Sequence, residues 1–260
     1  MDFINAIILL SNFVIVPSIT YGSQLALGAI GVTLIYGVLR FANFAYGDLM
    51  AFGTMCVILF TWLLKSWGIS LGILPTALLA LPFGIVLTIG VSLFFDRTVF
   101  EYYRNKKSSP VTFIVVSLGI MFVLNAVVRI IIGPNDIVFM DGARFIISAV
   151  EFREITGLLE GLTIKSTQVI TIITTSITCY LLFNFLNKTK TGKSMRAYSN
   201  NEDLALLSGI DPNKIILITW IIVSILATIG GTLYGLDKSF KPFTYFNNLL
   251  PIFAATIVGG

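Results

Sequence analysis

Six long apolar segments restrict this chain to folds that a lipid bilayer can accommodate. Each holds about 20 residues or more, which is the length that an α-helix needs to cross the hydrocarbon core. Because no water can pair with backbone groups inside a bilayer, such segments must satisfy their own hydrogen bonds as helices. The sequence therefore predicts an all-α, polytopic helical bundle that forms a single transmembrane domain over residues 1–260. The spans are expected near residues 13–39, 42–64, 71–95, 111–132, 168–187 and 214–236.

Two shorter apolar segments lie at the ends of the chain. Residues 3–12 are too few to span a bilayer alone, so we expect them to lie along the interface or to lengthen the first helix. The segment from Leu249 to Gly260 resembles the beginning of another span. It predicts a partial span and a sequence that is incomplete at its C-terminal end.

The composition excludes a soluble domain and argues against several kinds of chemistry. Hydrophobic residues make up 56% of the chain and charged residues only 12%, and the mean hydropathy is +0.93. Histidine is absent from the sequence, and Cys56 and Cys179 lie singly in apolar segments, where we interpret both as buried small side chains. We therefore expect no metal, no cofactor and no membrane enzyme.

The basic residues lie mostly in two loops and predict the orientation in the membrane. Residues 96–109 and 188–214 are rich in lysine and arginine, which places both loops in the cytoplasm. The N-terminus and residues 133–167 are then extracytoplasmic, and the mixed charge of the latter segment predicts a small surface cap. This bias also accounts for the net charge of +4 without a nucleic acid partner.

Residues 188–213 carry the signals of short helices that lie outside the membrane. Asn200 and Asp203 resemble a capping pair, Gly209 is a natural helix stop, and Asp211-Pro212 suits the first turn of the next span. A short cytoplasmic helix of this kind is expected to dock in a partner's groove. Its apolar patch is predicted to consist of Leu204, Ala205 and Leu207.

The segment from Ala26 to Gly47 combines a close-packing helix face with polar residues that are costly to place in lipid. Small residues recur at spacings of three and four before a break at Leu39-Arg40. Asp48 follows the break, and an ionisable side chain at mid-bilayer costs about 2.5–3.5 kcal/mol on insertion scales. Asp48 is therefore a candidate functional residue.

Four ordered segments together resemble the permease subunit of the branched-chain amino acid ABC importer family, which also includes urea and short-amide permeases. Two departures are Tyr46, where that family is expected to have histidine, and the basic residues Lys238 and Lys241. The segments are GAIGVTLIYGVLRFANFAYGDLMAFG (28–53), SLGIMFVLNAVVRIIIGP (117–134), GKSMRAYSNNEDLALLSGID (192–211), and GTLYG followed by PIFAATIVGG (231–235 and 251–260).

The resemblance implies a permease subunit of an ATP-driven importer in the inner membrane of a prokaryote, with branched-chain amino acids as the leading substrates. It implies a second permease subunit, the same or homologous, two cytoplasmic ATP-binding subunits and an extracytoplasmic solute-binding protein. The chain has no G-x-x-x-x-G-K-[ST] motif, and its one Gly192-Lys193-Ser194 lacks a preceding strand. We therefore expect a transport subunit that is not itself an enzyme, with ATP hydrolysed by a separate subunit.

The resemblance assigns one set of candidate residues, and the polar residues in the spans suggest a second set. The set for contact with the ATPase is Gly192, Lys193, Met195, Arg196, Ala197, Asn201, Asp203, Ala205 and Gly209. The set for the substrate path is Thr33, Tyr36, Asn43, Tyr46, Gly47, Asp48 and Asn125. The alternatives are a basic loop that only sets topology and polar side chains that only join helices. Arg129 either reaches toward the outer interface or contacts a substrate or docking protein.

Two alternative functions remain open from the sequence. A urea or short-amide permease would share all four segments. An ion-coupled secondary transporter would belong to a different class, and such proteins usually carry paired carboxylates or histidine inside the membrane. Asp48 is nearly alone in the spans, which argues against proton coupling.

Overall fold

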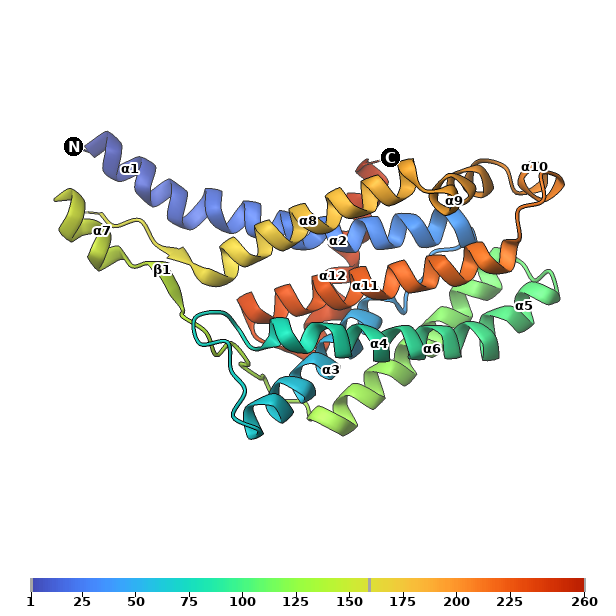
Figure 1. Cartoon of the computed structure of the whole chain (residues 1–260), viewed down its shortest axis with the longest axis horizontal. Coiled ribbons are helices and arrows are strands. Elements are labelled where there is room, and N and C mark those ends of the chain that lie inside the picture. Colours follow the sequence, from blue (N-terminus) through green and yellow to red (C-terminus); the bar gives the residue numbers. More distant parts are fainter. Residues whose placement is uncertain (1, 159, 260) are drawn as a thin grey trace.

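The computed structural model describes residues 2–158 and 160–259, and it is an elongated bundle of helices (Figure 1). Among these residues, six helices are long and apolar enough to cross a membrane, which confirms the predicted all-α, polytopic fold. The elements of this bundle are α1 (Asp2–Leu10), η1 (Ser11–Ile15), α2 (Val16–Leu39), α3 (Tyr46–Ser66), α4 (Ala77–Phe95), η2 (Asp96–Phe100), α5 (Glu101–Asn105), α6 (Pro110–Ile132), α8 (Ser166–Lys188), α11 (Pro212–Lys238) and α12 (Pro242–Gly259).

The first helix is longer than a single span. The helices α1 and α2 are joined through η1, a π-helical turn, into one apolar helix over Phe3–Leu39. Residues 3–12 therefore lengthen the first helix and do not form a separate interfacial segment.

Three helices begin away from their predicted positions, two of them later because the chain is irregular before them. Arg40 has a left-handed backbone with φ of 62°, and α3 begins only at Tyr46, after an irregular stretch. Turns with positive φ at Gly68 and Gly72 delay the start of α4 to Ala77. The last helix, by contrast, begins at Pro242, seven residues before the predicted partial span.

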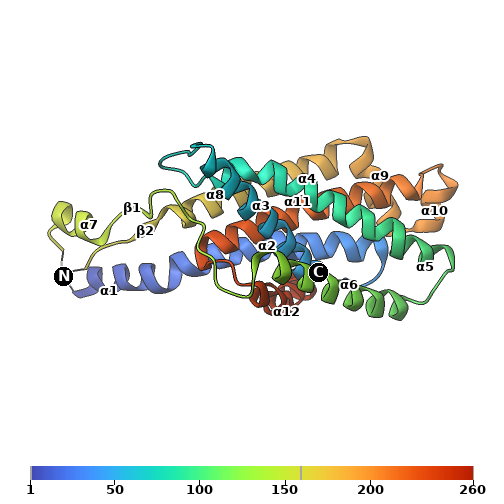
Figure 2. The ribbon, with the colours of Figure 1, turned by 90° about the horizontal axis from the view of Figure 1, so that it is seen from below.

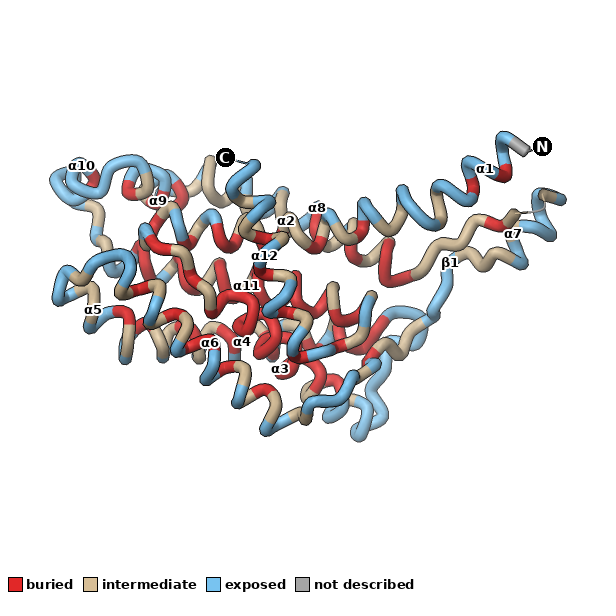
Figure 3. The backbone as a smooth tube through the Cα atoms, turned by 180° about the vertical axis from the view of Figure 1, so that it is seen from behind, coloured by how far each residue is buried: buried red, intermediate tan, exposed pale blue. Residues whose placement is uncertain are grey.

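The helices α3 and α11 form the centre of the bundle, and buried residues follow both of them (Figure 3). Small residues allow their backbones to approach closely. A Cβ atom added at Gly231 would lie 2.7 Å from the Met50 carbonyl oxygen and 2.6 Å from Thr54 Oγ1. Similarly, a Cβ atom at Gly53 would lie 2.6 Å from Thr228 Oγ1.

A small cap formed by residues 133–158 and 160–167 lies at one end of the bundle. It contains the antiparallel strands β1 (Phe145–Ile147) and β2 (Ile164–Lys165), with α7 (Ala149–Thr156) between them. Asn12 in η1 holds this hairpin, because its amide nitrogen donates to the Gly161 carbonyl at 2.8 Å and its oxygen accepts from the Thr163 amide at 2.9 Å. The cap and α1 lie together at the same end (Figure 1).

The two basic loops meet at the opposite end, as the sequence predicts. The helices α5, α9 (Lys190–Asn200) and α10 (Glu202–Leu207) lie together there in both ribbon views (Figure 2). The Arg40 guanidinium donates to the Ser199 carbonyl oxygen, which joins the end of α2 to α9.

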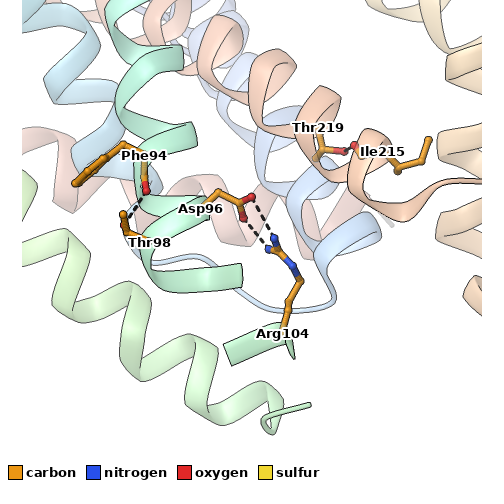
Figure 4. Close-up of polar contacts among 6 residues, drawn as sticks. All are labelled: Phe94, Asp96, Thr98, Arg104, Ile215 and Thr219. Atoms are coloured by element: carbon orange, nitrogen blue, oxygen red, sulfur yellow. Dashed lines mark hydrogen bonds and ion pairs between the residues drawn. The ribbon is translucent and has the colours of Figure 1, made fainter. Parts of the chain in front are cut away.

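An ion pair fixes the first basic loop. Arg104 on α5 binds Asp96 in η2 through both carboxylate oxygens, with Nη1 to Oδ1 at 2.6 Å and Nη2 to Oδ2 at 3.1 Å (Figure 4). Nearby threonine hydroxyls donate to carbonyls of their own helices, as Thr98 does to Phe94 and Thr219 does to Ile215 (Figure 4). These threonine hydroxyls are thus satisfied within their own helices.

Candidate translocation path and coupling segment

Asp48 and Asn125 form a polar contact in the interior of the bundle. Asp48 lies in the first turn of α3 and is fully buried, and Asn125 Nδ2 on α6 donates to its Oδ1 at 2.7 Å. The second oxygen, Oδ2, has no hydrogen-bond partner among the described residues. Arg129 lies one turn further along α6. The contact therefore joins α3 to α6 in the interior of the bundle.

The Arg129 side chain stacks on an aromatic ring. Its Cζ atom lies 3.4 Å from the centroid of the Phe243 ring in α12. A guanidinium over an aromatic face is an attractive cation–π contact. Arg129 therefore packs against a neighbouring helix, and the cluster of Asp48, Asn125, Arg129 and Phe243 connects α3, α6 and α12. We call it the polar cluster.

Asn43 shapes the irregular stretch before α3. Its side-chain oxygen accepts a hydrogen bond from the Ala45 amide at 3.0 Å, and the side chain is buried. The neighbouring Phe44 amide donates to Ser117 Oγ on α6 at 3.1 Å. The oxygen of Asn43 is thus engaged by the backbone of its own turn.

Tyr46 and Gly47 seat the start of α3 against its neighbours. Tyr46 is fully buried with its hydroxyl directed at Gly31 on α2, and that hydroxyl has no hydrogen-bond partner in the described part of the chain. A Cβ atom at Gly47 would lie 2.8 Å from the Tyr245 carbonyl oxygen. Both positions require close contact, at α2 for Tyr46 and at α12 for Gly47.

Thr33 and Tyr36 face a different space. They line a groove of about 500 Å³ between α2 and α12, together with Phe253 and Ile257. Tyr36 is 58% exposed, and the Thr33 hydroxyl donates to the Ala29 carbonyl of its own helix. The structure therefore does not bring the seven candidate path residues into one site, because two lie in this open groove and the other five lie in the interior or at the start of α3.

The candidate coupling segment consists of two capped helices and not a single one. Thr189 caps α9 by accepting from the Gly192 amide at 3.0 Å. Asn201 caps α10 by accepting from the Leu204 amide at 3.0 Å. The predicted capping pair of Asn200 and Asp203 is therefore wrong by one residue.

The end of α10 follows the predicted signals. Gly209 has a φ of 78°, and the Ile210 amide donates to the Ala205 carbonyl at 3.1 Å, which is a glycine-terminated helix end. Asp211 then caps α11 by accepting from the Asn213 amide at 3.0 Å, with Pro212 in the first turn. The segment is thus tied at both ends to membrane-spanning helices.

The nine candidate coupling residues divide by burial. Gly192, Met195 and Ala205 are buried and pack against the chain's own bundle. The other six are exposed: Lys193, Arg196, Ala197, Asn201, Asp203 and Gly209. The sequence prediction missed Tyr198, which is also buried and follows Gly192 and Met195 at spacings of three. That spacing, which places all three on one helix face, was the available signal.

Tyr198 joins the two helices of the segment. Its hydroxyl donates to the Glu202 carboxylate at 2.7 Å. Burial raises the pKa of this hydroxyl above its ordinary value, and the hydrogen bond to Glu202 raises it further. The hydroxyl therefore remains a donor at neutral pH.

Three leucines on α10 are exposed at the surface. The exposed fractions of Leu204, Leu206 and Leu207 are 60%, 42% and 84%. Leu206 therefore replaces the buried Ala205 in the predicted apolar patch. We call these three residues the leucine patch.

The chain is similar to known proteins over most of its length. Residues 14–260 match the family described as the branched-chain amino acid transport system permease component. The chain is 26% identical over 247 residues to the high-affinity branched-chain amino acid transport system permease protein LivH of Escherichia coli, covering 93% of this chain and 76% of the relative.

Two other relatives cover a similar share. The high-affinity branched-chain amino acid transport system permease protein BraD of Pseudomonas aeruginosa is 24% identical over 256 residues, which is 95% of this chain and 78% of the relative. The probable branched-chain amino acid transport permease protein LivH of Methanocaldococcus jannaschii is 30% identical over 249 residues, with coverages of 94% and 72%. No solved structure matches the chain.

Proposed function

This chain belongs to the family of branched-chain amino acid transport permeases, and we propose that it is the membrane-spanning subunit of an ATP-driven importer that carries branched-chain amino acids across the inner membrane. The observation that carries the proposal is the family match over residues 14–260, which includes the first apolar helix from Val14 onward, the other five apolar helices and the coupling segment. Relatives from bacteria and an archaeon bear names of the same transport system.

The importer would contain a second permease subunit, two cytoplasmic ATP-binding subunits and an extracytoplasmic solute-binding protein. A second permease would cover the apolar groove between α2 and α12, where Tyr36 and Ile257 are 58% and 78% exposed. Separate ATPases would supply energy, since the sequence has no nucleotide-binding motif.

The end that holds α5, α9 and α10 would face the cytoplasm, with the N-terminus on the outer side. Ten of the chain's 17 lysines and arginines support this orientation, because they lie in the segments of that end. These are Arg40, Arg97, Arg104, Lys106, Lys107, Lys188, Lys190, Lys193, Arg196 and Lys214.

The leucine patch on α10 would dock in a groove of the ATPase. Apolar side chains on a short, exposed helix favour such a groove. The buried face of α9, formed by Gly192, Met195 and Tyr198, would transmit a push on α10 to the bundle. The exposed residues Lys193, Arg196, Asn201 and Asp203 would form the polar rim of this interface.

A pair of matched variants tests the proposal. Leu207→Asp places a charge in the leucine patch, whereas Ile155→Asp places one at an equally exposed apolar position on α7 at the opposite end. We expect Leu207→Asp to abolish co-purification with the ATPase and ATP-driven leucine uptake by the reconstituted importer, whereas Ile155→Asp retains co-purification with the ATPase. Uptake of urea or acetamide in place of leucine by the unaltered importer would contradict the substrate assignment.

A further inference from the structure

A second cavity lies between the cap and the end of α11. It has a volume of about 500 Å³ and is lined by charged residues from both parts of the chain. Arg144 and Lys165 come from the cap hairpin and the start of α8, whereas Asp237 and Lys238 end α11. We call this space the cap pocket. It is separate from the groove between α2 and α12 and from the polar cluster.

The walls of the cap pocket are fixed by backbone hydrogen bonds. The Ile137 amide donates to the Phe240 carbonyl at 2.9 Å, and the Phe240 amide donates back to Ile137 at 2.8 Å. Phe240 is fully buried beneath this bridge. On the other side, the Ser166 amide donates to the Arg144 carbonyl at 3.2 Å. Backbone hydrogen bonds therefore hold the pocket in shape, and it is not a gap between loose loops.

The charges in the cap pocket are only partly paired. Within the described residues, neither Arg144 nor Lys165 has an ion-pair partner. Lys238 Nζ lies 3.8 Å from Asp237 Oδ2, and the Asp237 side chain is only 8% exposed. Two free cations can bind a carboxylate, and a sheltered carboxylate can bind an ammonium group. The pocket thus offers both halves of the contact that an α-amino acid requires.

The remaining wall of the pocket is apolar. Val138, Met140 and Leu236 lie on it beside the charged residues. Small-molecule sites combine an apolar lining with a few polar groups that fix orientation. The apolar wall suits a branched aliphatic side chain, whereas urea would leave it unused.

We propose that the cap pocket is a binding site for a zwitterionic α-amino acid with an apolar side chain. The carboxylate binds Arg144 and Lys165, and the ammonium group binds Asp237. This assignment rests on the proposed function, because it makes the pocket the place where the permease first receives its substrate on the side of the cap.

Binding of radiolabelled L-leucine to the purified, full-length chain in lipid nanodiscs tests the assignment. Leucinamide lacks the carboxylate and N-acetyl-leucine lacks the ammonium group, so each should compete about tenfold more weakly than leucine. Lys165→Gln and Asp237→Asn should each weaken leucine binding by about tenfold or more. Lys241→Gln removes the same charge outside the pocket, from an exposed pair with Asp136, and should leave binding unchanged.

The outcomes separate this proposal from the proposed function. Saturable binding that both pocket variants weaken supports the site, and one folded variant suffices if the other does not fold. Absence of saturable leucine binding, or equal binding by the pocket variants and Lys241→Gln, overturns it. If the assembled importer still takes up leucine in that case, the proposed function stands, whereas absence of leucine uptake by the unaltered importer would overturn the function itself.

Discussion

The Asn125 side-chain amide donates to the buried Asp48 carboxylate at 2.7 Å and so joins α6 to α3. Arg129, one turn from Asn125 on α6, is stacked on Phe243 of α12. A buried charge is tolerated only when it is paired and hydrogen-bonded. Asn125 supplies one such hydrogen bond to Asp48, and the contact joins two helices in the interior of the bundle.

Replacing Asn125 by alanine should destabilise the protein by about 1–3 kcal/mol, because it removes a hydrogen bond from a buried carboxylate. Thermal unfolding in detergent measures the effect. Asn200→Ala is the control, since Asn200 is exposed at the end of α9. Equal melting temperatures for the two variants would show that the contact contributes nothing.

Asp48 and Arg129 should behave as a coupled pair. Asp48→Asn and Arg129→Gln each remove one partner of the pair. The double variant should therefore lose less stability than the sum of the losses in the two single variants. Interaction energies of this kind are about 0.5–3 kcal/mol for contacting residues. A double-mutant cycle on unfolding measures it, and strict additivity would contradict the pairing. Full transport by Asp48→Asn would also remove Asp48 from the candidate path.

Gly231→Ala should destabilise the crossing of α3 and α11 by about 1–3 kcal/mol, because the new methyl group would meet the Met50 carbonyl. Gly90→Ala provides the matched control, since a Cβ atom at Gly90 has no neighbour within 4 Å. Melting temperatures of the two variants test the prediction. A loss of stability in the Gly90 variant as large as that in the Gly231 variant would argue against the close approach.

Removing the Asn12 side chain should loosen the cap hairpin. Asn12→Ala loses both hydrogen bonds to residues 161–163, which contribute about 1 kcal/mol each. Hydrogen exchange at the Thr163 amide should become faster. In Asn135→Ala, a change at an exposed position of the same cap, that amide should keep its protection.

The contact between the cap and the loop before α4 should weaken in acid. Burial raises the pKa of Asp141, but hydrogen bonds from Thr76 and the Lys65 ammonium outweigh this effect, so the pKa lies below its ordinary value. A lowered pKa adds stability above the unfolded value of about 3.9, and that stability is lost as pH falls through the folded value. The protection factor of the Thr76 amide, which corrects for the slower intrinsic exchange in acid, should therefore fall below about pH 4. Asp141→Asn should abolish this pH dependence.

The sequence predicted the spans well because hydropathy alone selects segments that can lie in lipid. It placed the start of α3 too early because Phe41 and Ala42 are apolar, whereas the break depends on the left-handed backbone at Arg40 and on hydrogen bonds of Asn43 and Phe44. Local composition does not encode these contacts.

The candidate sites were predicted less completely, because they depend on which face each helix presents. Thr33 and Tyr36 lie two and five residues after Gly31, yet Gly31 meets Tyr46 in the interior while the other two face the open groove. The cap at Asn201 was assigned to its neighbour, since two adjacent asparagines are equivalent by composition. The predicted patch contained Ala205 in place of Leu206, because the face of α10 on which each residue lies depends on how the helix packs.

The unbroken helix Phe3–Leu39 mechanically links the two ends of the molecule. At 1.5 Å per residue it extends over about 55 Å, well beyond the roughly 30 Å of hydrocarbon in a bilayer. Asn12 fastens it to the hairpin near one tip, and Arg40, directly after the other tip, grips Ser199. The contact with the cap hairpin and the contact with α9 are therefore connected through continuous helical backbone and not through a loop.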